Sequence, residues 1–119
     1  MVTNASWYGR AFKNRPTASG VLFDPEQLVG AHPSLPLGSR VCVTDLAKGR
    51  SVVVTIVDRG PFMRGRGIDL SYAAARSLGI VRRGIARVRI DLLSNRHAPP
   101  VMIAQAAGAG ARLPGALTE

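Results

Sequence analysis

The sequence is poor in cysteine, aromatic and acidic residues. It has a single cysteine, Cys42, three Phe, two Tyr and one Trp, and 7 acidic residues against 16 basic ones. One cysteine excludes a framework of intramolecular disulfides. The few aromatics disfavour a stacking platform for single-stranded nucleic acid, in which aromatic and basic side chains are interleaved. No apolar run approaches the roughly 18 residues that a membrane-spanning helix requires.

Metal-binding and export signals are also missing. The two histidines, His32 and His97, do not belong to a cluster with metal-ligand spacing, so no metal or other cofactor is expected. Cys42 has no neighbouring His or Asn, and a packed, unreactive thiol is expected there. The first four residues have neither the basic nor the apolar region of a signal peptide, and we expect residues 1–4 to be disordered.

What remains is the composition of one small globular domain with a basic surface. The chain has 119 residues, of which 46% are hydrophobic, enough for one modest core. Its net charge of +9 attracts polyanions such as nucleic acid, anionic lipid or acidic wall polymers. Because the arginines are scattered and aromatics are few, nucleic-acid binding is kept only as the most distant alternative.

Runs of β-branched residues predict that most of the chain is β-sheet. Strands are expected at residues 6–12, 40–46, 51–57 and 86–92, with a hairpin loop at 47–50. Residues 52–57 are apolar at nearly every position, which predicts a strand buried on both faces. Prolines and glycines between residues 15 and 38 indicate long turns and short strands.

One helix is predicted at residues 71–78. Ser71 can cap it, three alanines follow, and Gly79 can end it. Asp69 precedes this cap, and a negative charge near a helix N-terminus is stabilising, so a structural role is expected for it. We therefore expect a folded domain at 5–95, followed by a flexible Ala/Gly/Pro-rich tail at 96–119.

Two turn-rich motifs carry the candidate site. Thr-Ala-Ser-Gly at 17–20 leads to Gly-Ala-His at 30–32, and Asp-Arg-Gly-Pro-Phe at 58–62 leads to Ile-Asp-Leu-Ser at 68–71. Gly60 tolerates φ values that other residues avoid, and Pro61 fixes its own φ. Asp58 thus follows a strand in a rigid turn, a common way to present a carboxylate to a cleft. The alternative is that Asp58 and Arg59 only make hydrogen bonds within the turn.

These motifs resemble the rare lipoprotein A family of bacterial cell-envelope proteins. The likeness covers nearly all of residues 5–93, through short motifs in the family's order at 5–9, 17–20, 31–32, 35–38, 58–62, 68–71 and 78–79. The resemblance implies a mainly all-β fold, a six-stranded double-psi β-barrel with one short helix. It also implies a lytic transglycosylase that cuts peptidoglycan glycan strands, or a barrel related to expansin-like wall-binding proteins.

The resemblance implies that Asp58 and His32 are the catalytic residues. In a lytic transglycosylase an acid protonates the glycosidic oxygen while the sugar's own 6-hydroxyl closes on the anomeric carbon. Asp58 is expected to supply the acid, and His32 to relay a proton or bind the sugar from the same groove. The alternative for His32 is that it only forms hydrogen bonds within its loop.

Five residues near this pair are expected to bind the sugar: Trp7, Tyr8, Ser19, Asp24 and Arg59. The two aromatic rings can stack on sugar faces, with core packing as the alternative for at least one of them.

One position departs from the family pattern. The motif at 17–20 is usually followed in the family by a Glu that is thought to take part in catalysis, and this chain has Val21 there. Asp24, three residues further on, is too far along the chain to replace it. A non-catalytic barrel that binds wall glycan or protein is therefore the second hypothesis for the function.

The resemblance also implies a location and partners. We expect an exported, monomeric protein of the periplasm or cell envelope that acts on glycan strands, with cell-division or envelope proteins as further partners. Its export signal or lipid anchor would then lie upstream of this sequence or have been removed.

Overall fold

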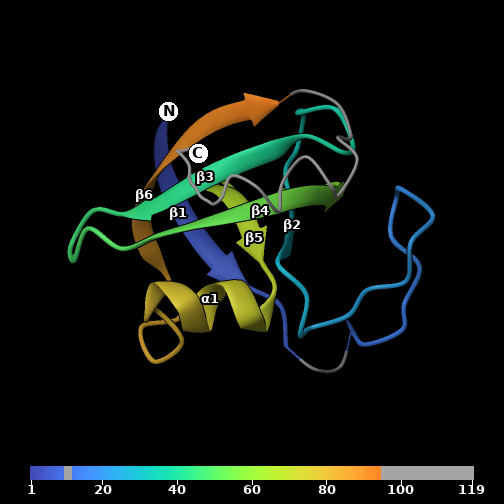
Figure 1. Ribbon diagram of the computed structural model, residues 1–119, viewed down its shortest axis with the longest axis horizontal. Helices are drawn as coiled ribbons and strands as arrows, with labels where there is room; N and C mark the ends of the chain where they lie inside the picture. The colour runs from blue at the N-terminus through green and yellow to red at the C-terminus, as the bar shows by residue number, and fades with distance from the viewer. Residues whose placement is uncertain (10–11, 95–119) are drawn as a thin grey trace, which may run out of the picture.

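The computed structural model describes residues 1–9 and 12–94, which form a closed barrel (Figure 1). Its elements are β1 (Val2–Trp7), β2 (Val29–Ala31), β3 (Arg40–Asp45), β4 (Ser51–Asp58), β5 (Arg66–Leu70), α1 (Tyr72–Leu78) and β6 (Ala86–Ser94). Around the barrel the order is β1-β5-β2-β4-β3-β6. The β1–β5 and β2–β4 pairs are parallel and the other pairs antiparallel. The prediction of a six-stranded barrel with one short helix is confirmed.

Alternating side chains fill the barrel interior. In β4, residues 52, 54 and 56 are buried, whereas residues 53, 55 and 57 are half-buried on the outer face. The prediction of a strand buried on both faces is wrong, because alternate residues of a barrel strand point outward. Cys42 of β3 is also half-buried, between the buried Val41 and Val43, and does not belong to the core.

The first strand begins earlier than the sequence indicated. β1 covers Val2–Trp7 and pairs with both β5 and β6. Residues 2–4, expected to be disordered, are therefore part of the barrel, because backbone pairing with β6, and at Asn4 also with β5, holds them. The strand also ends at Trp7 and not at Phe12. His97 and the predicted tail at 96–119 lie outside the described residues.

The helix forms where it was predicted. The Ser71 side chain accepts a hydrogen bond from the backbone N–H of Ala74, and Gly79 ends the helix with a left-handed φ of 77°. The buried alanines and Leu78 pack α1 against the barrel core. In the described part of the chain, no helix is long and apolar enough to cross a membrane.

Two short strands that the sequence did not predict close the barrel beside the candidate site. Ala31, the last residue of β2, lies opposite Asp58 of β4 on one side and Asp69 of β5 on the other. Gly30 permits this close approach, because a Cβ atom there would lie 2.9 Å from the backbone oxygen of Asp69. Asp58, Ala31 and Asp69 therefore form one row across three adjacent strands.

Candidate active site

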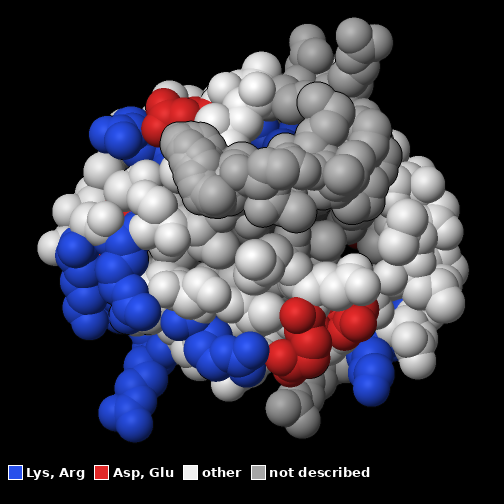
Figure 2. Space-filling view, viewed as in Figure 1, with Lys and Arg blue, Asp and Glu red and all other residues white. Residues whose placement is uncertain are grey.

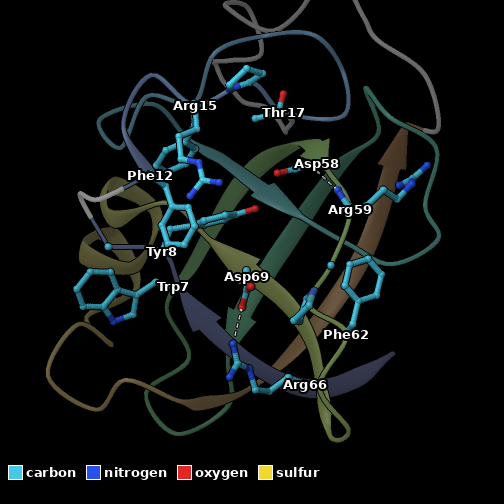
Figure 3. Close-up of a pocket in the computed structure, with 15 residues that line it drawn as sticks. Trp7, Tyr8, Phe12, Arg15, Thr17, Asp58, Arg59, Phe62, Arg66 and Asp69 are labelled. Atoms are coloured by element: carbon cyan, nitrogen blue, oxygen red, sulfur yellow. Dashed lines mark hydrogen bonds and ion pairs between the residues drawn. The ribbon is translucent and has the colours of Figure 1, made fainter.

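A cavity of about 380 Å³ opens beside the ends of β1 and β4 (Figure 3). Its lining comes from β1 and the loop after it, from the turn after β4, and from β5: Trp7, Tyr8, Gly9, Phe12, Arg15, Pro16, Thr17, Phe23, Asp58, Arg59, Gly60, Pro61, Phe62, Arg66 and Asp69. Of the residues expected to form the site, the structure brings four to this cavity: Trp7, Tyr8, Asp58 and Arg59. Three others, His32, Ser19 and Asp24, do not line it.

Asp58 connects the Thr-Ala-Ser-Gly motif at 17–20 with the Asp-Arg-Gly-Pro-Phe motif at 58–62. Its Oδ1 accepts the backbone N–H of Ala18 at 3.0 Å and that of Arg59 at 2.9 Å. Within the described residues its Oδ2 accepts no hydrogen bond, so this oxygen is available to a ligand. The turn that follows requires glycine at position 60, where φ is 113°. This geometry agrees with the expectation that a rigid turn presents the Asp58 carboxylate to a cleft.

Asp69 is a second carboxylate on the cavity wall, to which the sequence analysis gave a helix-stabilising role. α1 has no acidic residue in its first turn, and Asp69 lies inside β5, where its contacts run across the sheet. Its Oδ1 accepts hydrogen bonds from the hydroxyl of Ser6, its partner across the β1–β5 pair, and from Nη2 of Arg66 at 3.2 Å. The alternation of residues 68–70 could have indicated this position in the sequence. Ile68 and Leu70 are apolar and buried in the barrel, so the side chain of Asp69 between them faces away from the core.

Tyr8 places a phenol between the two carboxylates. Figure 3 shows its hydroxyl directed toward the space between Asp58 and Asp69. Burial raises the pKa of Tyr8, and the negative charges of Asp58 and then Asp69 raise it further. The phenol therefore keeps its proton at physiological pH and can donate a hydrogen bond. Its ring packs against Phe12 and Phe23, with centroid distances of 5.5 and 4.7 Å, which fixes its orientation.

Arg59 turns its guanidinium away from Asp58 (Figure 3). Its Nη1 donates to the backbone oxygen of Leu35 at 2.6 Å and to that of His32 at 3.3 Å. These bonds tie the 32–35 loop to the turn after β4. The guanidinium therefore has a structural role, although part of the side chain lines the cavity.

His32 is 4% exposed and does not line the cavity. Its Nδ1 accepts hydrogen bonds from the backbone N–H groups of Ser34 at 3.1 Å and Leu35 at 3.0 Å. The backbone N–H of His32 donates to the backbone oxygen of Asp58. Burial lowers the pKa of His32, and the positive charge of Arg59 lowers it further, so the imidazole is neutral and carries its proton on Nε2. The side chain is absent from the groove that it was expected to share with Asp58.

Ser19 and Asp24 make hydrogen bonds within their own loop. The Ser19 hydroxyl is 2.9 Å from that of Thr17, and Asp24 Oδ1 accepts the N–H of Glu26 at 2.9 Å. The N–H of Ser19 also donates to the backbone oxygen of Val57, which holds the loop against β4.

Val21 opens toward a different cavity. It is 52% exposed and lines a space of about 450 Å³ on the outer side of β4, together with Ala18, Ser19 and Leu37. The position at which the resembling family carries Glu is therefore absent from the lining of the Asp58 cavity.

Two aromatic side chains at the cavity have different surroundings. Trp7 packs edge-on against Tyr72, with centroids 5.5 Å apart, and against the core. Phe62, the last residue of the Asp-Arg-Gly-Pro-Phe motif, is 81% exposed and lines the cavity. A solvent-exposed aromatic ring beside carboxylates offers an apolar face on which a sugar can stack.

The chemistry available to this cavity is acid–base chemistry. Asp58 and Asp69 are separated by one intervening strand, which corresponds to roughly 10 Å between Cα atoms. Both carboxyl groups line the same cavity, as the paired carboxyl groups that flank the scissile bond do in glycoside-cleaving enzymes. Among residues 1–9 and 12–94, no three His, Cys, Asp or Glu side chains gather so that they could hold a metal ion.

Comparison with known proteins gives close relatives. The family model described as lytic transglycolase matches residues 1–90. A probable endolytic peptidoglycan transglycosylase RlpA of Nostoc sp. is 59% identical over 91 residues, which cover 75% of this chain and 24% of that protein. The endolytic peptidoglycan transglycosylase RlpA of Pseudomonas aeruginosa strain PAO1 is 44% identical over 126 residues, covering 94% of this chain and 37% of that protein. The chain spans well under half the length of these curated relatives.

Solved structures share the barrel. The Streptomyces papain inhibitor superposes with a TM-score of 0.60 at 26% identity, covering 76% of this chain and 92% of that one. An expansin of Clavibacter michiganensis superposes with a TM-score of 0.63 at 23% identity, covering 83% of this chain and 54% of that one, which shows likeness of fold alone. From the extent of the family match and the identity to its relatives, the chain belongs to the lytic transglycolase family and its fold is a double-psi β-barrel.

Proposed function

We propose that this chain is the catalytic barrel of an enzyme that cleaves the glycan strands of peptidoglycan by lytic transglycosylation. The observation that carries the proposal is the pair of carboxylates, Asp58 and Asp69, on one cavity wall with the Tyr8 phenol directed between them. The relatives named endolytic peptidoglycan transglycosylase support this substrate.

Lytic transglycosylation needs no water. The bond between the anomeric carbon and the glycosidic oxygen breaks as that oxygen receives a proton. The 6-hydroxyl of the same sugar bonds to the anomeric carbon and gives up its own proton, which leaves a 1,6-anhydro end. The site must therefore supply a proton donor, a proton acceptor, and negative charge near the anomeric carbon, where positive charge develops. Two carboxyl groups on one wall meet all three requirements.

The partners of the two carboxylates distinguish their roles. Asp69 Oδ1 lies 3.2 Å from Nη2 of Arg66, and we assign Asp69 as the carboxylate that accepts the proton beside the anomeric carbon. Asp58 forms no ion pair within the described residues, because the Arg59 guanidinium is bound to backbone oxygens. We assign Asp58 as the proton donor and the protonated Tyr8 as a hydrogen-bond donor that orients the substrate.

His32 acts through Asp58 as a positioning residue. It holds the 32–35 loop through Nδ1, the loop oxygens hold Arg59, and its backbone N–H binds Asp58 directly. The exposed ring of Phe62 and the cavity edge of Trp7 supply surfaces on which sugar rings can stack.

This function implies where the protein works. Peptidoglycan lies outside the cytoplasmic membrane, so a chain that acts on it must be exported to the periplasm or cell envelope. The barrel closes within a single chain, which fits a monomer, and proteins of the division or envelope machinery would position it on the wall.

Incubation with purified glycan strands, followed by mass spectrometry of the ends, tests the proposal. The native chain should produce 1,6-anhydro ends, and Asp58→Asn and Asp69→Asn should each lower the rate by about 10²–10⁴-fold. Asp24→Asn makes the same chemical change outside the cavity and should leave the rate unaltered. Full activity in both the Asp58 and Asp69 variants would contradict the assignment.

A non-catalytic binding barrel is the second candidate function. Two observations favour it: Val21 stands where the family usually has Glu, and the barrel resembles a protein named as a papain inhibitor. The same incubation separates the two candidates. A binding barrel should bind glycan strands without producing anhydro ends, and it should bind them equally well in the native chain, in Asp58→Asn and in Asp69→Asn.

A further inference from the structure

The barrel has a basic surface on the side away from the cavity. Exposed basic side chains gather on the β3–β4 hairpin loop, on the turn after α1 and at the start of β6: Lys48, Arg50, Arg82, Arg83 and Arg87, here called the basic end. Figure 2 shows blue side chains at the left and lower left, where Figure 1 places this hairpin and this turn. The long loop between β1 and β2, which lines the cavity, lies on the opposite side of the same view.

Side-chain and backbone contacts join these segments into one surface. Arg83 on the turn pairs with Asp45 at the hairpin, with Nη2 2.6 Å from Oδ2. The backbone N–H of Leu46 donates to the backbone oxygen of Arg87. The Arg50 guanidinium lies over the end of α1, close enough that a Cβ atom on Gly79 would be 2.9 Å from its Nη1.

The basic end keeps most of its charge unpaired. Within the described residues, four of its side chains form no ion pair: Lys48, Arg50, Arg82 and Arg87. Arg83 is the member neutralised by a carboxylate. Four unpaired cations on one rigid surface attract a surface of high negative charge density.

Two exposed apolar side chains lie on the segments that carry the basic end. Leu46 is 45% exposed and Ile85 is 52% exposed. Leu46 is hydrogen-bonded to Arg87 through its backbone, and Ile85 precedes the buried Ala86, with which β6 begins beside Arg87. Exposed apolar side chains on the same surface as basic ones are typical of surfaces that lie on a bilayer, where cations meet lipid phosphates and apolar groups enter the headgroup boundary.

We propose that the basic end binds the surface of an anionic phospholipid bilayer, with Leu46 and Ile85 at headgroup depth. A soluble polyanion would use the four cations equally well, but it has no use for two exposed apolar side chains among them. Docking in this way turns the cavity away from the lipid. This inference does not depend on the proposed catalytic activity, because the two surfaces share no residue.

Co-sedimentation of the full chain with lipid vesicles tests this. The native chain should bind vesicles that contain phosphatidylglycerol, bind phosphatidylcholine vesicles weakly, and dissociate as salt is raised. Arg82→Gln combined with Arg87→Gln should weaken binding by roughly 25-fold, since each cation near an anionic surface contributes about fivefold. Leu46→Ser combined with Ile85→Ser keeps the charge and should weaken binding by about tenfold.

A matched control removes the same charge from loops outside the basic end. Lys13→Gln combined with Arg64→Gln should bind nearly as the native chain does, because both residues are exposed on loops beside the cavity. Circular dichroism confirms that each variant is folded, and turnover of glycan strands should be unchanged in the Arg82/Arg87 and Leu46/Ile85 variants.

Three results would overturn the proposal. The first is a folded native chain that ignores anionic vesicles, and the second is equal loss of binding in the control and in the Arg82/Arg87 variant. The third is full binding by the Leu46/Ile85 variant together with complete displacement by soluble polyphosphate, which would identify a polyanion as the ligand.

Discussion

The variant Arg83→Ala should destabilise the barrel although Arg83 lies at its surface. Its Nη2 is 2.6 Å from Oδ2 of Asp45, whose side chain is 0% exposed. Removing the guanidinium leaves a fully buried carboxylate without its counter-ion, which is among the costly changes that a fold can undergo.

The magnitude follows from the exposure of the two partners. Breaking a fully buried ion pair costs about 3–5 kcal/mol, and breaking an exposed one costs about 0–1 kcal/mol. Because Asp45 is fully buried while the Arg83 side chain is 34% exposed, the free energy of unfolding should fall by about 2–3 kcal/mol. In a domain of this size that lowers Tm by roughly 10–20 °C.

The same pair predicts how stability depends on pH. Burial alone would raise the pKa of Asp45, but the hydrogen bond and charge of Arg83 and the nearby backbone N–H groups of Ala47 and Lys48 outweigh it, and the pKa lies below its ordinary value. A folded pKa below the unfolded one contributes stability that is present above about pH 3.9 and is lost as pH falls through the folded value. In Arg83→Ala burial dominates, so the loss should begin at higher pH.

Urea denaturation with circular dichroism, repeated from neutral to acidic pH, measures both effects. Arg82→Ala is the matched control, because Arg82 is the adjacent exposed arginine and forms no ion pair in the part of the chain that the structure describes. Its free energy of unfolding should stay within about 0.5 kcal/mol of the native value. Equal midpoints for the Arg82 and Arg83 variants would refute the reasoning.

Three further predictions follow from the surroundings of the site. Gly30→Ala should lower the free energy of unfolding by about 1–3 kcal/mol in urea, because its Cβ atom would meet the Asp69 backbone oxygen at 2.9 Å. His32, whose pKa is lowered by burial and then by Arg59, should contribute stability that is complete above about pH 6.5 and declines as pH falls toward its folded value. A stability titration checks this, and the decline should vanish in His32→Asn. Val21→Glu should leave strand cleavage within about twofold of native, because residue 21 is outside the Asp58 cavity; a gain of about tenfold would identify it as the missing acid.

Local patterns along the chain determined about half of the elements. β3, β4, β6 and α1 were predicted to within two residues of their ends, because alternation, β-branched runs and helix caps are properties of short segments. The rigid turn that presents Asp58 was predicted for the same reason, since Gly60 and Pro61 restrict the backbone wherever they occur.

Tertiary pairing decided the other strands. β1 extends to Val2 because β6 pairs with it there, and β2 is a strand of three residues that contains Gly30. Neither segment has enough β-branched residues or alternation to be recognised alone. β5 was not predicted for the same reason, because the strand has only five residues and one of them is Gly67.

The two residues whose roles changed most, Asp69 and His32, show why the site needed the fold. Along the chain Asp69 lies next to a helix cap, but across the sheet it lies beside Ser6 and one strand away from Asp58. His32 follows a strand that pairs with the Asp58 strand, yet its ring turns back onto its own loop. Charges and hydrogen-bond partners act over a few ångströms through space, so the chemistry of both side chains is set by strand register, which the linear sequence does not specify.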